Sequence, residues 1–337
     1  MQNEDTDKIM FSVIVPVYNG EFIIDKCLES LANQTSDNFE VIFVNDGSTD
    51  HSLDKLNNYK RKQVDRRIIV IDQKNSGAGQ ARNNGMNYAN GEYLIFLDSD
   101  DYIDYTFIEE ANAVVLRDDP DIVFVDLVRE AANGKVIRFE LMSVYKKLSK
   151  DAMIRQQLTG KIPWGGVRKI VKTQIVKEGG HRYGSISVGE ESIYSFGILR
   201  DSEVISFMPG VYYHYYDNSQ SLTAHDKPEY SGMVFNYICK ELQGKGLYSS
   251  YEMTINALAA TTVAITINVL AKQYSFRDAL RLGRECLGEY NRYIQSQIDY
   301  EALESRVKIC LPFLKAGMTA PVIFASYLQS IIKKLRR

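Results

Sequence analysis

Short apolar runs alternate with amphipathic stretches through the first third of the chain. Between the apolar runs, residues 21–33 place their apolar side chains on one helical face, and residues 79–88 form a second helical stretch after a glycine-rich loop. The apolar runs have the β-branched and aromatic composition of strands and cover residues 11–17, 39–44, 68–72, 93–97 and 122–128. Strands that alternate with helices in this way are typical of a parallel sheet with crossover helices.

The strict alternation ends near residue 149. We expect helices over residues 150–158 and 190–199, strands near 204–207 and 211–216, and a hairpin turn at Asn133-Gly134. From about residue 228 every pattern is helical. The apolar stretch 257–271 contains threonines and is shorter than the roughly 18–20 apolar residues of a membrane span, so we expect a buried helix. The predicted division is an α/β domain over residues 1–225 and a helical region over residues 226–337.

Composition narrows the functional classes. The 337 residues carry a net charge of −3, so no overall basic field favours a nucleic-acid partner. The four cysteines are scattered without a CxxC pair, so we expect neither a zinc site nor a redox motif. Residues 1–8 are polar and lack the apolar core of a signal peptide, and we therefore expect a cytoplasmic protein.

Polar, glycine-rich loops follow each of the first four predicted strands. They read Tyr-Asn-Gly at 18–20, Asp-Gly-Ser-Thr-Asp at 46–50, Asn-Ser-Gly at 75–77 and Asp-Ser-Asp-Asp at 98–101. In open α/β sheets, ligands bind beyond the carboxyl ends of the strands. One such loop is compatible with an ordinary turn, but four along one edge predict a binding site.

The acidic loop at residues 98–101 is the strongest single element. Successive side chains of an extended segment alternate, so Asp98 and Asp100 project to the same side. Two carboxylates placed in this way repel each other unless a cation lies between them, and Mg²⁺ or Mn²⁺ would also bridge the phosphates of a ligand. The alternative is an acidic turn before the next helix.

The segment NSGAGQARNNG at 75–85 places glycines before a helix whose first turns carry Arg82. Free N–H groups and a guanidinium suit a phosphate or sugar hydroxyls, although glycine-rich helix starts are also common as simple caps. The segment is not the GxGxxG of NAD-binding proteins, and the chain has no GxxxxGK[ST] phosphate loop.

VPVYNG, VNDGSTD, NSGAGQARNNG and FLDSDD occur in the order seen in family 2 glycosyltransferases of the GT-A fold. Residues 164–169 look like the tryptophan motif that this family places near the acceptor, and residues 188–191 look like its Glu-Asp motif. The chain therefore resembles this family over residues 11–223. The resemblance implies a Rossmann-like mixed α/β sheet with helices on both faces, followed here by a helical C-terminal region without a recognisable motif.

The resemblance also implies roles for individual residues. Asp46 would hold the base, Arg82 the donor sugar or diphosphate, and Asp98 the ribose or donor sugar. Asp100 would be the main protein ligand of Mn²⁺ or Mg²⁺. The whole donor-binding set is Pro16, Val17, Tyr18, Asn19, Asp46, Gly77, Arg82, Asp98 and Ser99.

Glu191 stands where the family usually has an aspartate that acts as general base. A carboxylate can take the proton of the acceptor hydroxyl as its oxygen attacks the anomeric carbon, and a single displacement inverts that carbon. Glu190 is the rival candidate. Both residues are also explained as first-turn acids that a helix dipole favours.

Two further residues have two interpretations each. His214, in a tyrosine-rich strand, matches a position where the family often reaches phosphate or metal, and it is equally a structural histidine. Trp164, the single tryptophan, is interpreted as a stacking platform for an acceptor sugar or as a core residue.

The C-terminal stretch combines an apolar stripe with a basic end. Phe324, Tyr327 and Leu328 fall on one helical face, and lysines and arginines cluster at 333–337. This pattern fits peripheral contact with the inner face of an anionic membrane, and it fits equally a terminal helix packed on its own domain.

Together these features predict an inverting, metal-dependent transferase. It would move a sugar from a nucleotide-sugar, expected to be UDP-linked, to a saccharide or a lipid-linked saccharide in bacterial surface polysaccharide synthesis. The alternatives are a non-catalytic nucleotide-sugar-binding partner and a sugar-nucleotide pyrophosphorylase. The pyrophosphorylase should show a basic, glycine-rich signature after the first strand, and VPVYNGE lacks it.

Overall fold

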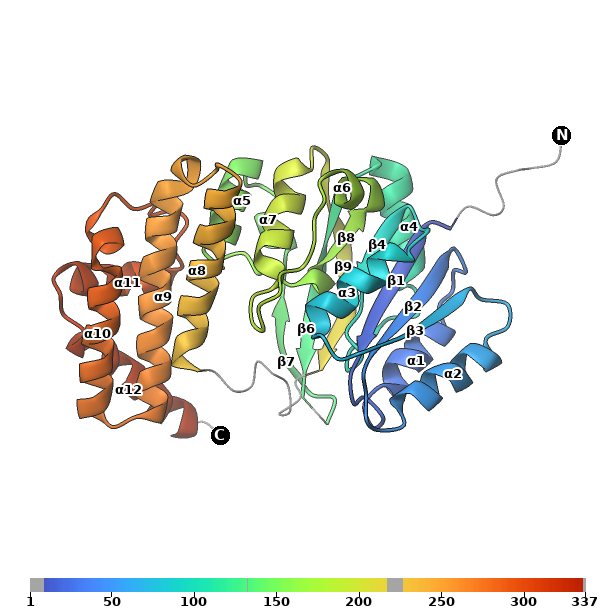
Figure 1. Cartoon of the computed structure of the whole chain (residues 1–337), viewed down its shortest axis with the longest axis horizontal. Helices are drawn as coiled ribbons and strands as arrows, with labels where there is room; N and C mark the ends of the chain where they lie inside the picture. The colour runs from blue at the N-terminus through green and yellow to red at the C-terminus, as the bar shows by residue number, and fades with distance from the viewer. Residues whose placement is uncertain (1–8, 132, 217–226, 336–337) are drawn as a thin grey trace. The chain divides into compact units, whose positions relative to one another are not determined.

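The protein is described by a computed structural model that covers residues 9–131, 133–216 and 227–335 (Figure 1). The chain divides into two compact units. The first comprises Met1–Leu148 and Trp164–Ser221, and the second comprises Ser149–Pro163 and Leu222–Arg337.

The first unit is built on one mixed sheet with the strand order β3-β2-β1-β4-β8-β6-β9-β5, and β7 pairs with β6 beside this path. Strands β3, β2, β1 and β4 are parallel, whereas β8 is antiparallel to both β4 and β6. The strands are β1 Phe11–Val17, β2 Phe39–Asp46, β3 Ile68–Gln73, β4 Tyr93–Phe96, β5 Tyr102–Ile103, β6 Ile122–Glu130, β7 Val136–Glu140, β8 Lys169–Lys172 and β9 Ile205–Tyr216.

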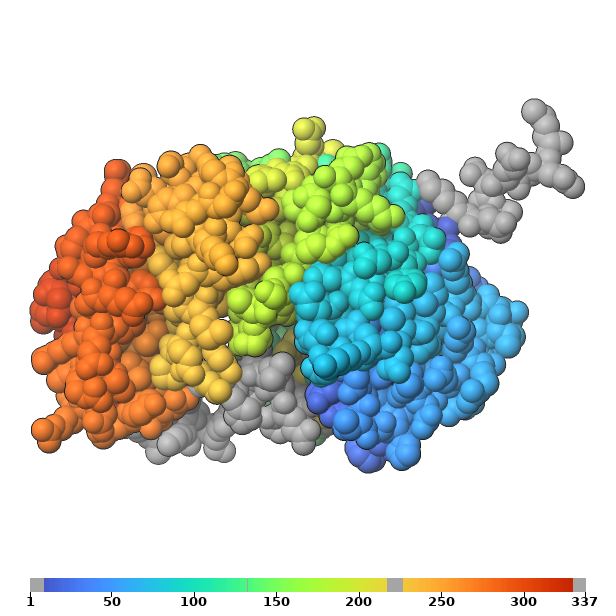
Figure 2. Space-filling view, in the orientation of Figure 1, coloured from blue at the N-terminus to red at the C-terminus, as the bar shows by residue number. Residues whose placement is uncertain are grey.

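Helices cover both faces of this sheet because its central strands are apolar on both sides. Every residue of β1, β2 and β4 is buried. Helices α1 (Asp25–Ala32), α2 (Ser52–Lys62) and α4 (Phe107–Asp118) share one core with the odd-numbered residues of β1. On the other face, α3 (Ala78–Asn87) packs on β1 and β2, and its side chains, cyan in Figure 2, cover the sheet there. Tyr194 of α7 (Glu191–Asp201) packs edge-on against Phe96 of β4.

The contact between α3 and β1 requires glycine. A Cβ on Gly85 of α3 would lie 2.5 Å from Ile14, so α3 can approach β1 this closely only without a side chain there. The predicted mixed α/β fold with helices on both faces is confirmed.

The region after β4 departs from the expected elements. The predicted strands at 204–207 and 211–216 are one strand, β9, which passes through Pro209 and Gly210 with shifts in its pairing to β6. Gly210 has a φ of +92°, which allows the chain to continue through the irregularity. Strand β8 was not anticipated, because its four residues, Lys-Ile-Val-Lys, are too short a run to show a period. The hairpin at Gly134, with a φ of +77°, is confirmed.

The second unit is helical in the part that the structure describes. Its helices are α5 Lys150–Leu158, α8 Pro228–Gly244, α9 Glu252–Gln273, α10 Phe276–Gln295, α11 Ser305–Lys315 and α12 Ala320–Leu335. Helix α9 lies at the centre and contacts the other five. Residues 249–273 are long and apolar enough to span a membrane, but 78% of the most apolar window is buried inside the protein. The prediction of a buried helix over 257–271 is confirmed.

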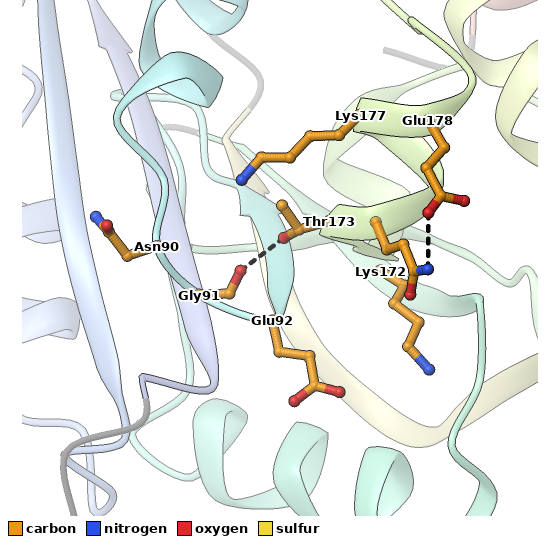
Figure 3. A pocket seen from close by; sticks show the side chains of 8 residues that line it. Asn90, Gly91, Glu92, Lys172, Thr173, Lys177 and Glu178 are labelled. Carbon is orange, nitrogen blue, oxygen red and sulfur yellow. Dashed lines mark hydrogen bonds between the residues drawn. The ribbon is translucent and has the colours of Figure 1, made fainter.

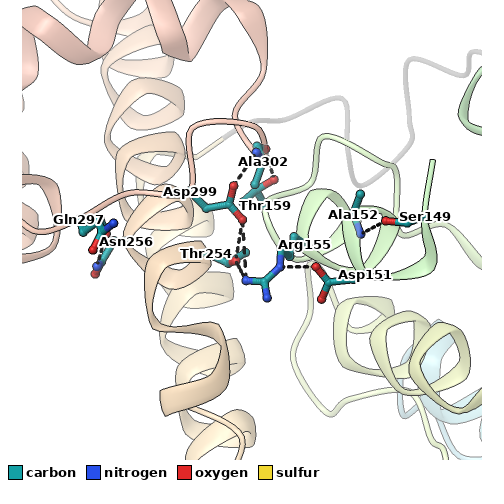
Figure 4. Close-up of polar contacts among 10 residues, drawn as sticks. All are labelled: Ser149, Asp151, Ala152, Arg155, Thr159, Thr254, Asn256, Gln297, Asp299 and Ala302. Carbon is teal, nitrogen blue, oxygen red and sulfur yellow. Dashed lines mark hydrogen bonds and ion pairs between the residues drawn. The ribbon is translucent and has the colours of Figure 1, made fainter.

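Helix α5 belongs to the helical unit although it lies in the sequence between elements of the α/β unit. Arg155 donates to Asp151 at 2.7 Å and to the Thr254 hydroxyl at 3.3 Å, and its guanidinium lies 3.9 Å from Asp299 (Figure 4). The buried Thr159 hydroxyl donates to the carbonyl of Ala302 at 2.6 Å. A division of the chain at residue 225 does not anticipate that α5 belongs to the helical unit. Nothing in the sequence of α5 distinguishes a helix that packs on a sheet from one that packs on helices.

Candidate active site

The loops after β1 and β2 are tied together by side-chain hydrogen bonds. The side-chain oxygen of Asn19 accepts from the backbone amide of Thr49 at 2.8 Å. The backbone amide of Asn19 donates to the Ser48 hydroxyl at 3.0 Å. Asn19 has a φ of +49°, a region that asparagine tolerates better than most residues. These contacts place Tyr18, which is 53% exposed, and Asn19 at the carboxyl edge of the sheet, whereas Pro16 and Val17 are buried within β1.

Asp46 at the end of β2 organises the neighbouring loop. Its buried carboxylate accepts from the amides of Ser76 and Gly77, both at 2.8 Å, and from the Gln73 side chain at 2.7 Å. Gly77, with a φ of +89°, then leads into α3. Asp46 therefore joins the loops after β2 and β3. The sequence predicted a role for Asp46 with the nucleotide base but did not reveal this structural role.

The acidic loop after β4 is a turn rather than the extended segment that the sequence suggested, because the Asp101 amide donates to the Asp98 carbonyl at 3.0 Å. The Asp98 carboxylate accepts from Arg82 at 2.6 Å. Burial and the neighbouring Asp98 carboxylate raise the pKa of Asp100 to about 6. The Ser99 hydroxyl lies beside Gly20, 3.8 Å from where a Cβ on that glycine would lie, so the loops after β1 and β4 adjoin.

Asp101 points the other way and anchors the acidic loop to β9. Its buried carboxylate accepts from the Tyr213 hydroxyl at 2.6 Å and from the Tyr216 amide at 2.8 Å. The same tyrosine oxygen accepts from the Asp98 amide at 3.3 Å. Burial raises the pKa of Asp101 well above its usual value, and Asp98 and Asp100 add to this. Sequence reasoning missed Tyr213, because a tyrosine in a tyrosine-rich strand carries no signal of its own.

Arg82 connects the acidic loop to the Glu-Glu pair. Its buried guanidinium donates to Asp98 at 2.6 Å and contacts Glu190 at 3.4 Å. It also lies over the ring of Tyr183, 5.3 Å from its centre. Burial alone would lower the pKa of Arg82, but the negative groups around it raise it above the usual value. Residues 82, 98 and 190, far apart in the sequence, thus meet at one point.

Glu190 and Glu191 are placed differently at the start of α7. Glu190 packs against the first turn of α3, where a Cβ on Gly79 would lie 2.8 Å from the Glu190 Cγ. Its pKa is raised to about 7 by burial and by the Glu191 carboxylate, against the opposing effect of Arg82. Glu191 begins α7 and is half-buried. Both predicted acids therefore lie at the site.

The tryptophan loop lies beside α7. The Trp164 carbonyl accepts from the Ser195 hydroxyl of α7 at 2.5 Å. A short 3-10 turn, η2 (Gly166–Arg168), follows, and Gly166 packs so tightly that a Cβ there would lie 2.2 Å from the Tyr183 hydroxyl. Trp164 itself is half-buried. The loop that it begins contacts Ser195, which lies on the same helix as Glu191.

His214 is placed differently from the metal-ligand role considered for it. One ring nitrogen contacts Glu130 and the other Asp104, both at 3.0 Å, and the ring stacks on Tyr102 with centres 4.3 Å apart. With both nitrogens engaged by carboxylates, neither is left to bind a cation, and His214 instead joins β9 to β5 and β6. The sequence could not show this, because the two carboxylates are 84 and 110 residues away.

The residues present fit a divalent cation that is held by one or two protein carboxylates and mainly by the phosphates of a bound substrate. Within the described ranges, no group of three or more His, Cys, Asp and Glu side chains gathers as a closed metal cage. Mg²⁺, however, is usually held by one or two carboxylates together with substrate phosphates. Asp100, beside Asp98, supplies that donor set. Burial and the Asp98 carboxylate both raise the pKa of Asp100, and a bound cation would offset both effects.

A hollow of about 460 Å³ lies at the opposite edge of the sheet (Figure 3). Two hydrogen bonds join residues that line it: the Thr173 hydroxyl donates to the Gly91 carbonyl at 2.7 Å, and Gln174 donates to Glu178 at 2.8 Å. None of the four polar loops contributes to it. The hollow is therefore not part of the candidate site.

The raised pKa of Glu190 predicts a pH-dependent stability. From an ordinary value of 4.5 it rises to about 7, so the folded state binds more protons than the unfolded state between these values. Stability must then fall as pH rises through this window. Glu190→Gln should remove this loss and melt higher than wild type at pH 8, by about 2–4 °C for each kcal/mol gained.

Thermal melts at pH 5 and pH 8, without nucleotide or metal, measure the difference. The exposed acid Glu203 provides the matched control, because Glu203→Gln should change the two melting points equally. A Glu190→Gln protein that keeps the full wild-type pH dependence would contradict the prediction.

Comparison with known proteins agrees with this geometry. Residues 12–170 match the model of glycosyl transferase family 2. A Bacillus subtilis protein named as a glycosyltransferase, EpsH, is 34% identical over 213 residues, and the match spans 60% of each chain. The poly(ribitol-phosphate) β-N-acetylglucosaminyltransferase TarS of Staphylococcus aureus is 26% identical over 254 residues, which cover 73% of this chain and 43% of TarS.

The solved structure of residues 1–349 of TarS, in complex with UDP-GlcNAc, has the same fold. It superimposes with a TM-score of 0.69 at 23% identity, over 95% of this chain and 92% of that one. The matched family residues run from β1 into β8 and include the four polar loops, Arg82 and the tryptophan loop. Residues 12–170 therefore carry a glycosyl transferase family 2 domain, and the chain has the GT-A fold.

Proposed function

We propose that this protein is an inverting glycosyltransferase that transfers a sugar from a UDP-sugar to a hydroxyl of a saccharide or lipid-linked saccharide. The observation that carries the proposal is the meeting of Asp98, Arg82 and Glu190, which joins the donor-side loops to the helix that bears Glu191. The solved TarS structures with UDP and with UDP-GlcNAc support a UDP-linked donor. The names of the relatives support a role in bacterial surface polysaccharide synthesis.

The two sides of the site would divide the work. On the donor side, Arg82 and the N-terminal end of α3 would face the diphosphate, with Tyr18 and Asn19 beside the nucleoside. A Mn²⁺ or Mg²⁺ ion held by Asp100 and Asp98 would stabilise the charge of the UDP leaving group. On the acceptor side, Trp164 would stack on the acceptor sugar.

Glu191 is the proposed base. Glu190 is occupied by Arg82 and packed against Gly79, whereas Glu191 begins the helix beside the Trp164 loop. The Glu191 carboxylate would take the acceptor proton while the acceptor oxygen bonds to the anomeric carbon and the bond to the UDP oxygen breaks. This single displacement inverts the anomeric carbon.

Peripheral membrane contact is proposed for the helical unit, with the protein at the cytoplasmic face. Phe324 and Leu328 of α12 are 58% and 44% exposed, although the neighbouring Tyr327 packs on Phe276. Phe276 is itself 45% exposed, so the apolar stripe extends onto α10. Lys333 and Lys334 follow along the same helix, and Arg336 and Arg337 lie outside the described residues. An aromatic stripe beside basic residues suits a lipid-linked acceptor at an anionic bilayer.

The metal proposal predicts that UDP binding depends on a divalent ion through Asp100. Calorimetry should show UDP affinity falling about tenfold or more in EDTA, because the diphosphate would then face the Asp98 and Asp100 carboxylates without a bridging cation. Asp100→Ala should bind UDP with an affinity that Mn²⁺ no longer improves. Asp25→Ala, an exposed acid on α1, is the control and should behave as wild type. Equal UDP affinity with and without EDTA in the wild type would argue against the ion.

The proposed base predicts that Glu191→Gln lowers sugar transfer by roughly 10²–10⁴-fold, the usual contribution of general-base catalysis. UDP affinity should barely change, because the carboxylate acts on the acceptor. Glu191→Asp restores the residue common in the family and should still lose rate if the backbone is adapted to glutamate. Rate measurements over a panel of UDP-sugars, with Glu203→Gln as control, make the comparison. Near-normal transfer by Glu191→Gln together with its loss in Glu190→Gln would assign the base to Glu190.

The membrane proposal predicts that the full chain pellets with vesicles containing phosphatidylglycerol and much less with phosphatidylcholine alone. The double variant Phe324→Ser/Leu328→Ser should reduce pelleting several-fold, because it removes apolar area that would enter the bilayer. Ile309→Ser changes an exposed apolar residue, 71% exposed, on α11 and is the control. Equal pelleting of the double variant and wild type would refute this contact.

A further inference from the structure

A buried lysine lies directly behind the tryptophan loop. Lys169, the first residue of β8, is 1% exposed and is among the largest fully buried side chains of the protein. Placing an ammonium in the interior costs several kcal/mol unless acceptors surround it. A methionine of similar length would fill the same space without that cost.

Three acceptors surround the Lys169 ammonium, one for each of its N–H donors. They are the Trp164 carbonyl, the Gly165 carbonyl at 2.8 Å and the Ser195 hydroxyl at 2.9 Å. The Ser195 hydroxyl donates in turn to the Trp164 carbonyl. Both carbonyls belong to the loop that β8 follows, so the lysine folds the loop back onto its own strand. The sequence places Lys169 at the end of the tryptophan motif but gives no sign that it is buried, because it is one of 40 lysines and arginines.

The acceptors come from the two segments that form the proposed acceptor side. Trp164 and Gly165 belong to the loop, and Ser195 belongs to α7. Ser195 lies four residues after Glu191, so the two side chains share one face of the helix. The lysine therefore connects the Trp164 loop to the helical turn next to the proposed base.

The charged groups around the Lys169 ammonium change its pKa in opposite directions. Burial lowers the pKa of Lys169 to about 7, the Glu191 carboxylate raises it, and the Arg168 guanidinium lowers it further. The three acceptors favour the protonated form, because a neutral amine would have only two N–H donors for them. Loss of the proton near neutral pH would leave one carbonyl or hydroxyl without its donor.

We propose that Lys169 is a positioning residue that holds the Trp164 loop against the Glu191 end of α7 and thereby sets acceptor binding. The inference rests on the proposed function only for its kinetic consequence. The connection between loop and helix is a property of the folded chain and can be measured without any substrate.

The single tryptophan provides a direct readout of the loop. In Lys169→Met we expect Trp164 emission to shift to longer wavelength and acrylamide quenching to increase, because the loop carbonyls lose their donor. Wild-type emission should titrate near pH 7, and this titration should be absent in the variant. Lys172→Met is the matched control on the same strand, since Lys172 pairs with Asp119 and does not contact the loop. It should keep the wild-type emission and titration.

Kinetics separate the acceptor from the donor. Lys169→Met should raise the KM for the acceptor about tenfold or more while UDP affinity stays unchanged. Ser195→Ala removes one acceptor and one donor of the same cluster and should show a smaller change in the same direction. If Lys169→Met does not fold, Ser195→Ala and the wild-type pH titration of Trp164 emission decide the question.

The outcomes distinguish this inference from the proposed function. Unchanged Trp164 emission and quenching in both variants, with no titration in the wild type, would overturn the role of Lys169 whatever the enzyme transfers. Conversely, the expected change in emission in a protein that transfers no sugar from any UDP-sugar would leave the connection intact and refute the proposed function.

Discussion

The buried Arg82 guanidinium is the interaction on which the arrangement of the site depends. Asp98 follows β4, Glu190 precedes α7, and Arg82 on α3 contacts both. Without its charge, two carboxylates would lie close together in a poorly hydrated site, and the Asp98 loop would lose its tie to α3. The helix that provides Arg82 is held in turn by glycines, because Gly85 allows α3 to reach β1 and Gly79 leaves room for Glu190.

Negative charge remains in excess around this guanidinium, and it raises the pKa values of particular carboxylates. Asp100 and Glu190 both have raised pKa values because they are buried beside other carboxylates. Asp101 accepts hydrogen bonds from β9, whereas the pKa of Asp100 is raised by burial and by the Asp98 carboxylate and is only partly lowered by Arg82. Such a site gains stability when a cation binds, so part of the binding energy of a metal and its diphosphate would come from repulsion already present in the fold.

The sequence predicted the first four strands and the polar loops that follow them. Strands β1 to β4 and their loops were predicted close to their observed positions, since an apolar run and the polar loop after it are both local signals. The sequence did not show contacts whose two partners lie far apart along the chain. The carboxylates that engage His214, the amides that Asp46 binds and the helices that retain α5 lie tens of residues away or more. Lys169 and Tyr213 were missed for the same reason, because only the fold shows what surrounds them.

The proposed donor and acceptor sides are therefore built on different principles. On the donor side, backbone amides, glycines and short loops follow four parallel strands, and Asp46 alone orders two of these loops. On the proposed acceptor side, the tryptophan loop and α7 flank the antiparallel strand β8 and are joined by two buried side chains, Lys169 and Ser195. If the proposed roles hold, a change of acceptor would alter the Trp164 loop while the donor loops stay in place. The match to the family model covers the four polar loops and the tryptophan loop and ends at residue 170, so α7, with Glu191, lies outside it.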